Sequence, residues 1–250
     1  MKKRFAICLL TWATAVSLHA GVVSSFSDIE IWAGDGASAT NRAAMVIQWN
    51  EGPTHHSLAW GYGWNSGTRT GWDMLTAIDL IDIRLSLDIN AGSVFGLFYD
   101  LDGDGGTYTP GTPGVYSVTS DTAGSVSDPG DLYQSGWVSA GYWEYSVFGG
   151  NFNYDVYDLN PPFDYLGSSS YSVSGNPSYG SVAWFSSPLG SSARELVNGS
   201  WDAYSFAESF GPVGIEQPLT ASVPEPAIFS LLIFSLGVVF HVRRKRLHSH

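Results

Sequence analysis

Three aspartates at alternate positions are the sharpest chemical feature of the sequence. Asp100, Asp102 and Asp104 stand in the run DLDGDG, in which glycines permit a tight turn. Carboxylates with this spacing can direct oxygens at one hard cation, as in the first half of an EF-hand calcium loop. The twelfth position of such a loop is Gly111, where a bidentate glutamate is required, so a full EF-hand is excluded. We expect either a calcium site in a β loop, completed by backbone carbonyls or a distant acid, or a solvated acidic turn without metal.

A second candidate site is an aromatic strip. Trp60, Tyr62 and Trp64 alternate with two glycines, so the three rings share one face if the segment is a strand. An exposed strip of this kind would stack on sugar rings. A buried strip would form a core face, and the glycines would let a neighbouring layer approach closely. The sequence favours the core interpretation and leaves the ligand-stacking one open.

No other group of residues indicates catalysis. His55 and His56 are adjacent, so on a strand they point to opposite faces, and the sequence suggests no third metal ligand. The chain has neither a G-x-S-x-G elbow nor a phosphate-binding glycine loop followed by a helix. Glycoside hydrolysis needs two carboxylates, and Glu144, which is flanked by two aromatic residues, is the nearest candidate. These observations favour a protein that is not an enzyme.

The elements that would position these residues are mostly strands. Residues 81–89 alternate between apolar and polar side chains, which is typical of a half-buried strand. One short helix is indicated by a capping box formed by Thr70 and Asp73, followed by apolar residues at every third position. We predict a mainly β, β-sandwich-like single domain with one short helix, and a compact α+β domain is the alternative. Further segments of strand length are residues 43–49, 57–64, 94–99, 136–148, 181–185 and 200–206.

The C-terminal tail carries a recognisable order of parts. Pro224, Glu225 and Pro226 precede an apolar stretch over residues 227–242, of about 16 residues, which is close to the minimum for crossing a membrane. A basic cluster follows and would remain on the cytoplasmic side. Its members are Arg243, Arg244, Lys245 and Arg246.

This tail resembles the PEP-CTERM sorting signal of bacteria that carry exosortase, and the resemblance covers residues 223–246. It implies an exosortase-like processing enzyme as a partner and a membrane anchor before processing. It also implies a destination at the cell surface and an association with exopolysaccharide production.

The N-terminus indicates export as well. Lys2, Lys3 and Arg4 precede an apolar run over residues 5–16, and Ala20 offers a small residue for cleavage, as in a secretory signal peptide. The only cysteine, Cys8, lies inside this segment, so the exported chain has no thiol. We therefore divide the chain into a signal peptide (residues 1–20), a β domain (21–210), a flexible stalk (211–222) and the sorting signal (223–246).

The charge of the exported part excludes one class of partner. Residues 21–222 hold four arginines and 22 acidic residues, which gives a formal charge of −18. Such a surface repels nucleic-acid phosphates and attracts divalent cations. The sequence thus predicts an exported, surface-sorted matrix or envelope protein that is not an enzyme, with polysaccharide as its candidate ligand. The alternatives are a secreted polysaccharide hydrolase and a calcium-stabilised structural module.

Overall fold

The structure is a computed structural model. It describes residues 21–51, 54–90, 93–111, 124–137, 141–148, 184–187, 190–207 and 215–222. The predicted signal peptide and sorting signal lie outside these ranges. Within them, no helix combines the length and the apolar character that crossing a membrane requires.

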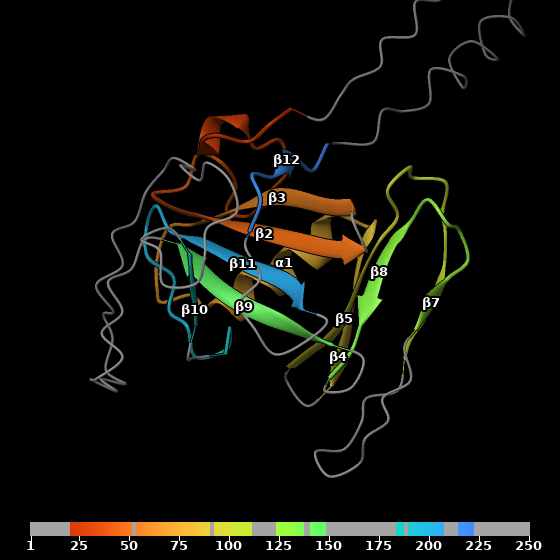
Figure 1. Cartoon of the computed structure of the whole chain (residues 1–250). Coiled ribbons are helices and arrows are strands. Elements are labelled where there is room, and N and C mark those ends of the chain that lie inside the picture. Colours follow the sequence, from red (N-terminus) through yellow and green to blue (C-terminus); the bar gives the residue numbers. More distant parts are fainter. Residues whose placement is uncertain are drawn as a thin grey trace, which may run out of the picture.

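A seven-stranded mixed sheet forms one layer of the domain, in the order β1-β3-β2-β11-β9-β10, with β12 also pairing with β3 (Figure 1). Strands β2 and β3 form a long antiparallel hairpin at its centre. Strand β11 runs parallel to β2 and antiparallel to β9. The strand bounds are β1 (Trp32–Gly34), β2 (Asn41–Glu51), β3 (Thr54–Trp64), β9 (Tyr142–Phe148), β10 (Trp184–Ser186), β11 (Trp201–Ala207) and β12 (Leu219–Thr220).

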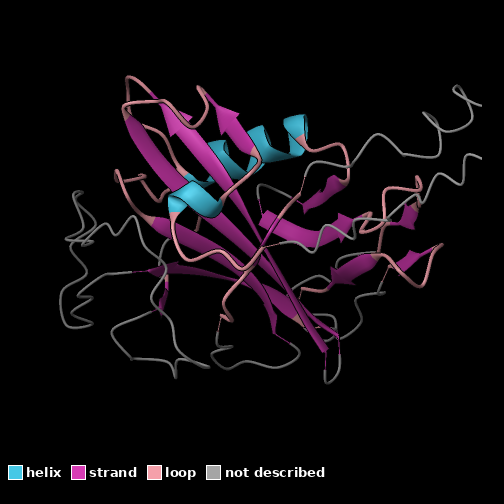
Figure 2. Cartoon of the chain, turned by 90° about the horizontal axis from the view of Figure 1, so that it is seen from above, coloured by secondary structure: helices cyan, strands magenta, loops and turns pink. Residues whose placement is uncertain are grey.

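A helix and a smaller sheet form the second layer. Helix α1 (Gly71–Ile81) lies across one face of the large sheet (Figure 2). The smaller sheet is antiparallel, in the order β4-β5-β8. A two-stranded hairpin of β6 and β7 lies beyond it, and a 3-10 helix (Phe26–Asp28) precedes β1. The remaining bounds are β4 (Leu85–Asn90), β5 (Ser93–Tyr99), β6 (Tyr108–Thr109), β7 (Ser125–Val126) and β8 (Leu132–Ser135).

The hydrophobic core lies between these two layers. Met74, Leu75 and Ile78 of α1 are fully buried and pack in one cluster with residues of both sheets. Each side chain of this size contributes about 1.5–3 kcal/mol by leaving water. Trp49 on β2 joins the layers by a hydrogen bond as well, because its Nε1–H donates to the carbonyl of Leu97 on β5 at 2.9 Å. The smaller sheet is therefore held to the large one by both packing and polar contact.

The prediction of a mainly β chain with one helix is confirmed over the part that the structure describes. The helix begins as expected: Thr70 Oγ1 accepts from the Asp73 N–H at 3.2 Å, and the Asp73 carboxylate accepts from the Thr70 N–H at 2.9 Å. The strand predicted over residues 81–89 begins only at Leu85. The helix continues to Ile81, and residues 82–84 turn the chain, which leaves Ile83 89 % exposed.

The prediction of a flexible stalk over residues 211–222 is wrong for residues 215–222. Strand β12 pairs in parallel with β3, and the Thr220 N–H donates to the carbonyl of Gly21 at 2.8 Å. Ile215 and Ala221 are fully or almost fully buried. Ile215 and Ala221 therefore attach this segment to the core, whereas Leu219 stays 40 % exposed, and the segment belongs to the domain.

Candidate metal centre

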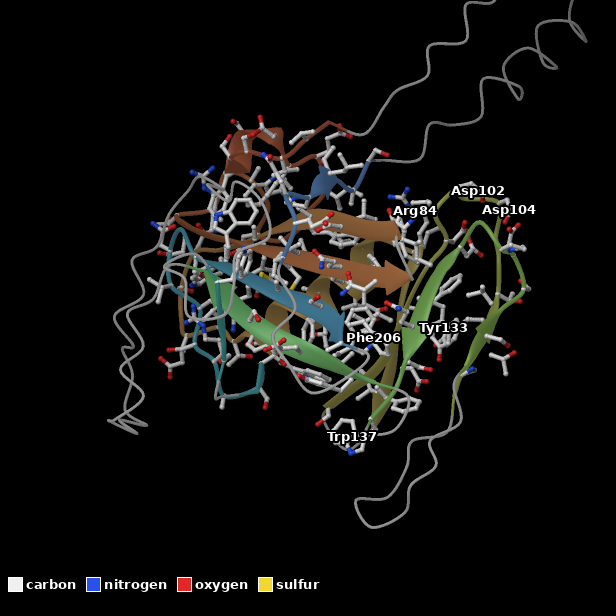
Figure 3. All side chains as sticks on the ribbon, viewed as in Figure 1. Arg84, Asp102, Asp104, Tyr133, Trp137 and Phe206 are labelled. Atoms are coloured by element: carbon white, nitrogen blue, oxygen red, sulfur yellow. The ribbon has the colours of Figure 1, made fainter. Side chains whose placement is uncertain are left out.

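The three predicted aspartates lie in the loop that follows β5. Asp100 is 7 % exposed, and its carboxylate accepts hydrogen bonds from the N–H groups of Gly103 (2.7 Å) and Gly105 (3.0 Å). Both glycines have positive φ, of 75° and 91°, which residues with a side chain adopt rarely. Asp102 in turn accepts from the Asp104 N–H at 3.1 Å. The run DLDGDG therefore forms a tight, internally hydrogen-bonded turn at one end of the smaller sheet (Figure 3).

The sheet register brings a second acidic loop to the same place. Strands β5 and β8 are antiparallel, with Tyr99 opposite Leu132. The end of β5 therefore meets the start of β8, where Asp128 and Asp131 stand in the preceding turn. The Leu101 N–H donates to Asp131 Oδ1 at 3.2 Å, which ties the two loops together.

Two groups of carboxylates result. Asp100, Asp102 and Asp131 each place one oxygen within 4.8 Å of the others, and Asp102, Asp104 and Asp128 form a second such group. Calcium binds oxygen ligands at about 2.3–2.6 Å, so two ligands of one ion lie at most about 5 Å apart. The observed spacing therefore fits a shared cation. Among the described residues, these are the groups of three His, Cys, Asp or Glu side chains that meet this condition.

Asp131 shows the strongest sign that a cation belongs here. The residue is 3 % exposed, and its Oδ2 has no hydrogen-bond partner among the described residues. A buried carboxylate oxygen without a partner is costly, because nothing replaces the water that it has lost. A Cβ on Gly106 would lie 1.9 Å from this oxygen, so the chain passes it closely where only glycine fits.

The electrostatics of the cluster agree. Burial raises the pKa of Asp131, the hydrogen bond from Leu101 opposes this rise, and repulsion from neighbouring aspartates adds to it. The pKa of the exposed Asp104 is raised as well, chiefly by repulsion from Asp102. A divalent cation would remove this repulsion and supply the partner that Asp131 Oδ2 lacks. The carboxylate set consists of hard oxygen donors, which suit calcium.

The sequence alone identified three of the five aspartates of these two groups. Its pattern directs Asp100, Asp102 and Asp104 at one ion, but Asp100 and Asp104 fall in different groups that share Asp102. The second loop adds Asp131 to the first group and Asp128 to the second. The run DPGD over residues 128–131 was a turn signal. Its proximity to the first loop follows only from the pairing of β5 with β8.

The aromatic strip is part of the core, and its interpretation as a ligand platform is wrong. Trp60, Tyr62 and Trp64 share a face as predicted, but they are only 0 %, 5 % and 5 % exposed. Helix α1 and β5 cover this face, and the Trp60 ring packs edge-on against Tyr99 with centroids 5.6 Å apart. On the opposite face, the Trp32 ring lies directly over Gly61, which explains that glycine.

One pocket formed by described residues contains two carboxylates, the group that glycoside hydrolysis requires. This pocket, of about 220 Å³ beside β3, holds the carboxylates of Asp35 and Asp73. Asp35 already accepts two hydrogen bonds from Asn65, at 2.9 and 3.0 Å, and Asp73 caps helix α1 through Thr70. Glu144 is 6 % exposed on β9 and does not line this pocket.

The arrangement as a whole can hold a hard divalent cation between two loops and thereby fix both to the end of the smaller sheet. The loops carry five aspartates in all, and the two groups share Asp102. No protein-family model matches the chain, and comparisons with curated proteins and with solved structures found no match either.

Proposed function

We propose that the chain is an exported, surface-sorted matrix or envelope protein that is not an enzyme, and that its β-sandwich-like domain is stabilised by calcium. The observation that carries the calcium part is the buried, unpartnered Oδ2 of Asp131 within the group formed with Asp100 and Asp102. Export and sorting are supported by the N-terminal signal pattern and by the tail with Pro224, Glu225 and Pro226.

The cation would act as a cross-link between loops. Asp100 is held to the sheet by its N–H, which donates to the Arg84 carbonyl at 3.0 Å, and Asp131 precedes β8 directly. A bound ion would join these two points and neutralise part of a strongly acidic domain. Because the only cysteine lies in the predicted signal peptide, no disulfide can do this work in the exported chain.

Calcium suits these loops better than magnesium. Calcium accepts six to eight oxygens in flexible geometry, whereas magnesium requires a nearly ideal octahedron and keeps several waters. The two irregular loops carry five carboxylates, of which Asp100 and Asp131 are buried and the others are partly or fully exposed, and they offer many oxygens without a strict octahedral arrangement.

Calorimetric titration of the purified full-length chain, in detergent and after treatment with EGTA, tests the metal centre. We expect calcium to bind with a dissociation constant of about 10⁻⁴–10⁻³ M, the range of extracellular calcium modules, and magnesium to bind more weakly. Absence of calcium binding up to 10 mM, or equal affinity for both ions, would refute the proposed centre.

The sorting part needs a separate experiment. Expression in a host with exosortase, followed by mass spectrometry of the surface fraction, should give a chain that has lost residues beyond the Pro-Glu-Pro element. Replacement of Glu225 by alanine should leave the tail intact and the protein in the membrane. An unprocessed wild-type chain in that fraction would contradict sorting by this route and would leave the calcium result unaffected.

A further inference from the structure

A pocket of about 500 Å³ lies next to the acidic loops and shares Asp100 with the first carboxylate group. Its wall runs from Asp100 and the glycines of the DLDGDG loop to β6 and the outer face of the smaller sheet. Its volume falls in the range of about 300–1,000 Å³ that is typical of small-molecule sites.

One wall of this pocket is an ordered aromatic stack. Tyr108 on β6 lies over Phe98 on β5, with ring centroids 5.0 Å apart and planes inclined by 22°. Tyr133 on β8, labelled in Figure 3, supports the same ring at 5.3 Å. Phe98 and Tyr133 are almost fully buried, whereas Tyr108 stays partly exposed. The ring of Tyr108 is therefore fixed from beneath, at low entropic cost to a ligand that stacks on it.

The other walls are mixed, and Ile83 and Arg84 line the pocket beside smaller polar side chains. Ser86 and Thr107 contribute hydroxyl groups, and Asp100 contributes to the pocket as well as to the first carboxylate group. Gly105 also lines the pocket, and a Cβ there would meet no atom within 4 Å, so the space beside this part of the loop is open. Three carboxylates satisfy only part of the six to eight oxygens that calcium takes, so oxygens of a ligand can complete the shell.

Sugars can contact both the aromatic wall and the polar groups of this pocket. A pyranose ring has an apolar C–H face that stacks on an aromatic ring, and its adjacent hydroxyl groups can bind both to a cation and to side-chain oxygens. A purely apolar ligand would displace water from the hydroxyls and from the Asp100 carboxylate of this pocket without replacing the hydrogen bonds of that water.

We infer that this pocket binds a sugar residue of an extracellular glycan, with the ring on Tyr108 and two adjacent hydroxyls on the cation held at Asp100. The contact between the sugar ring and Tyr108 rests on the aromatic stack, and the contact between the hydroxyls and the cation rests on the proposed calcium centre. It also places the glycan site in the second layer, away from the buried strip at Trp60, Tyr62 and Trp64.

The test is a printed array of microbial polysaccharides and oligosaccharides, probed with the full-length chain in calcium and in EGTA. The glycan bound most strongly is then titrated by calorimetry. Wild-type protein should bind in calcium and lose this binding in EGTA. Tyr108→Ala should weaken glycan binding by about tenfold or more, the loss expected for a central aromatic contact, and should leave the affinity for calcium unchanged.

Two variants serve as controls. Tyr108→Trp keeps a stacking ring and should retain binding, and Thr109→Ala changes the exposed neighbour on the same strand and should have no effect. The inference would be overturned if the Tyr108→Ala variant bound glycan as well as the wild type does, or if no glycan on the array were bound. Neither result would affect the separate measurement of calcium binding. Binding that persists in EGTA would overturn the contact between sugar and cation.

Discussion

Replacement of Asp131 by asparagine should change stability in opposite directions with and without calcium. In EGTA, the substitution removes a buried negative charge whose folded pKa lies above its ordinary value of 3.8. At neutral pH such a group destabilises the fold, because the unfolded state releases the proton more easily. The asparagine Oδ1 can still accept from Leu101, and its amide can donate to a neighbouring carboxylate. The variant should therefore be at least as stable as the wild type.

In calcium the order should reverse. With a dissociation constant of about 10⁻⁴ M, 10 mM calcium stabilises the folded wild type by about 2.7 kcal/mol. For a domain of this size, that corresponds to a rise in Tm of about 5–11 °C. Loss of one of the three carboxylates in its group should weaken binding about tenfold, which leaves about 1.4 kcal/mol and roughly half of the shift.

The assay is thermal unfolding followed by circular dichroism, in EGTA and in 10 mM calcium, at pH 7. Glu30→Gln is the control, because Glu30 is an exposed acid outside both carboxylate groups and its loss should leave the calcium-induced shift unchanged. An equal shift in the wild type and in the Asp131→Asn variant would refute the reasoning, since it would show that the buried carboxylate is not a ligand.

Three further predictions concern the rest of the fold. Burial raises the pKa of Asp79, which lies near the C-terminal end of α1. The ionised Asp79 carboxylate therefore destabilises the fold, and this destabilisation develops as the pH rises through that pKa. Asp79→Asn should therefore stabilise the fold by up to about 1 kcal/mol at pH 7 and change nothing at pH 3, as thermal melts at both values can show. Asp202→Leu should cost about 3–5 kcal/mol in denaturant unfolding, because it removes a fully buried carboxylate that lies 3.5 Å from the buried guanidinium of Arg194. Adding Arg194→Leu should recover part of this loss, and no recovery would contradict this account. Gly61→Ala should cost about 1–3 kcal/mol, since its Cβ would lie 2.3 Å from the Trp32 ring, and an unchanged denaturation midpoint would show that the ring yields freely.

Local patterns predicted the elements well. The capping box at Thr70 and Asp73 marks the start of α1, because its two hydrogen bonds involve residues only three positions apart. The alternation around Trp60 likewise indicates which rings share a face, because a strand fixes that arrangement by itself. The turn of the DLDGDG loop also depends on neighbouring residues alone.

The positions of these elements relative to one another could not be predicted from local sequence patterns. Whether Trp60 faces solvent or core depends on α1 and β5, which cover the strip from other parts of the chain. Asp131 joins Asp100 only because β8 pairs with β5, and no local signal encodes that pairing. At Ile83 the apolar alternation was misleading, because helix and turn geometry replaced the strand and left this side chain in solvent.

The attachment of the C-terminal segment has a mechanical consequence. The carbonyl of Ser222, the last described residue, accepts a hydrogen bond from the Arg84 guanidinium. The backbone carbonyl of Arg84 in turn accepts one from the backbone N–H of Asp100, at the base of the DLDGDG loop. If the tail anchors the chain as its sequence predicts, a pulling force from the membrane enters the domain at Ser222 and passes through Arg84 to the acidic loops. A calcium ion bound at these loops would then raise the force that is needed to pull them away from the smaller sheet.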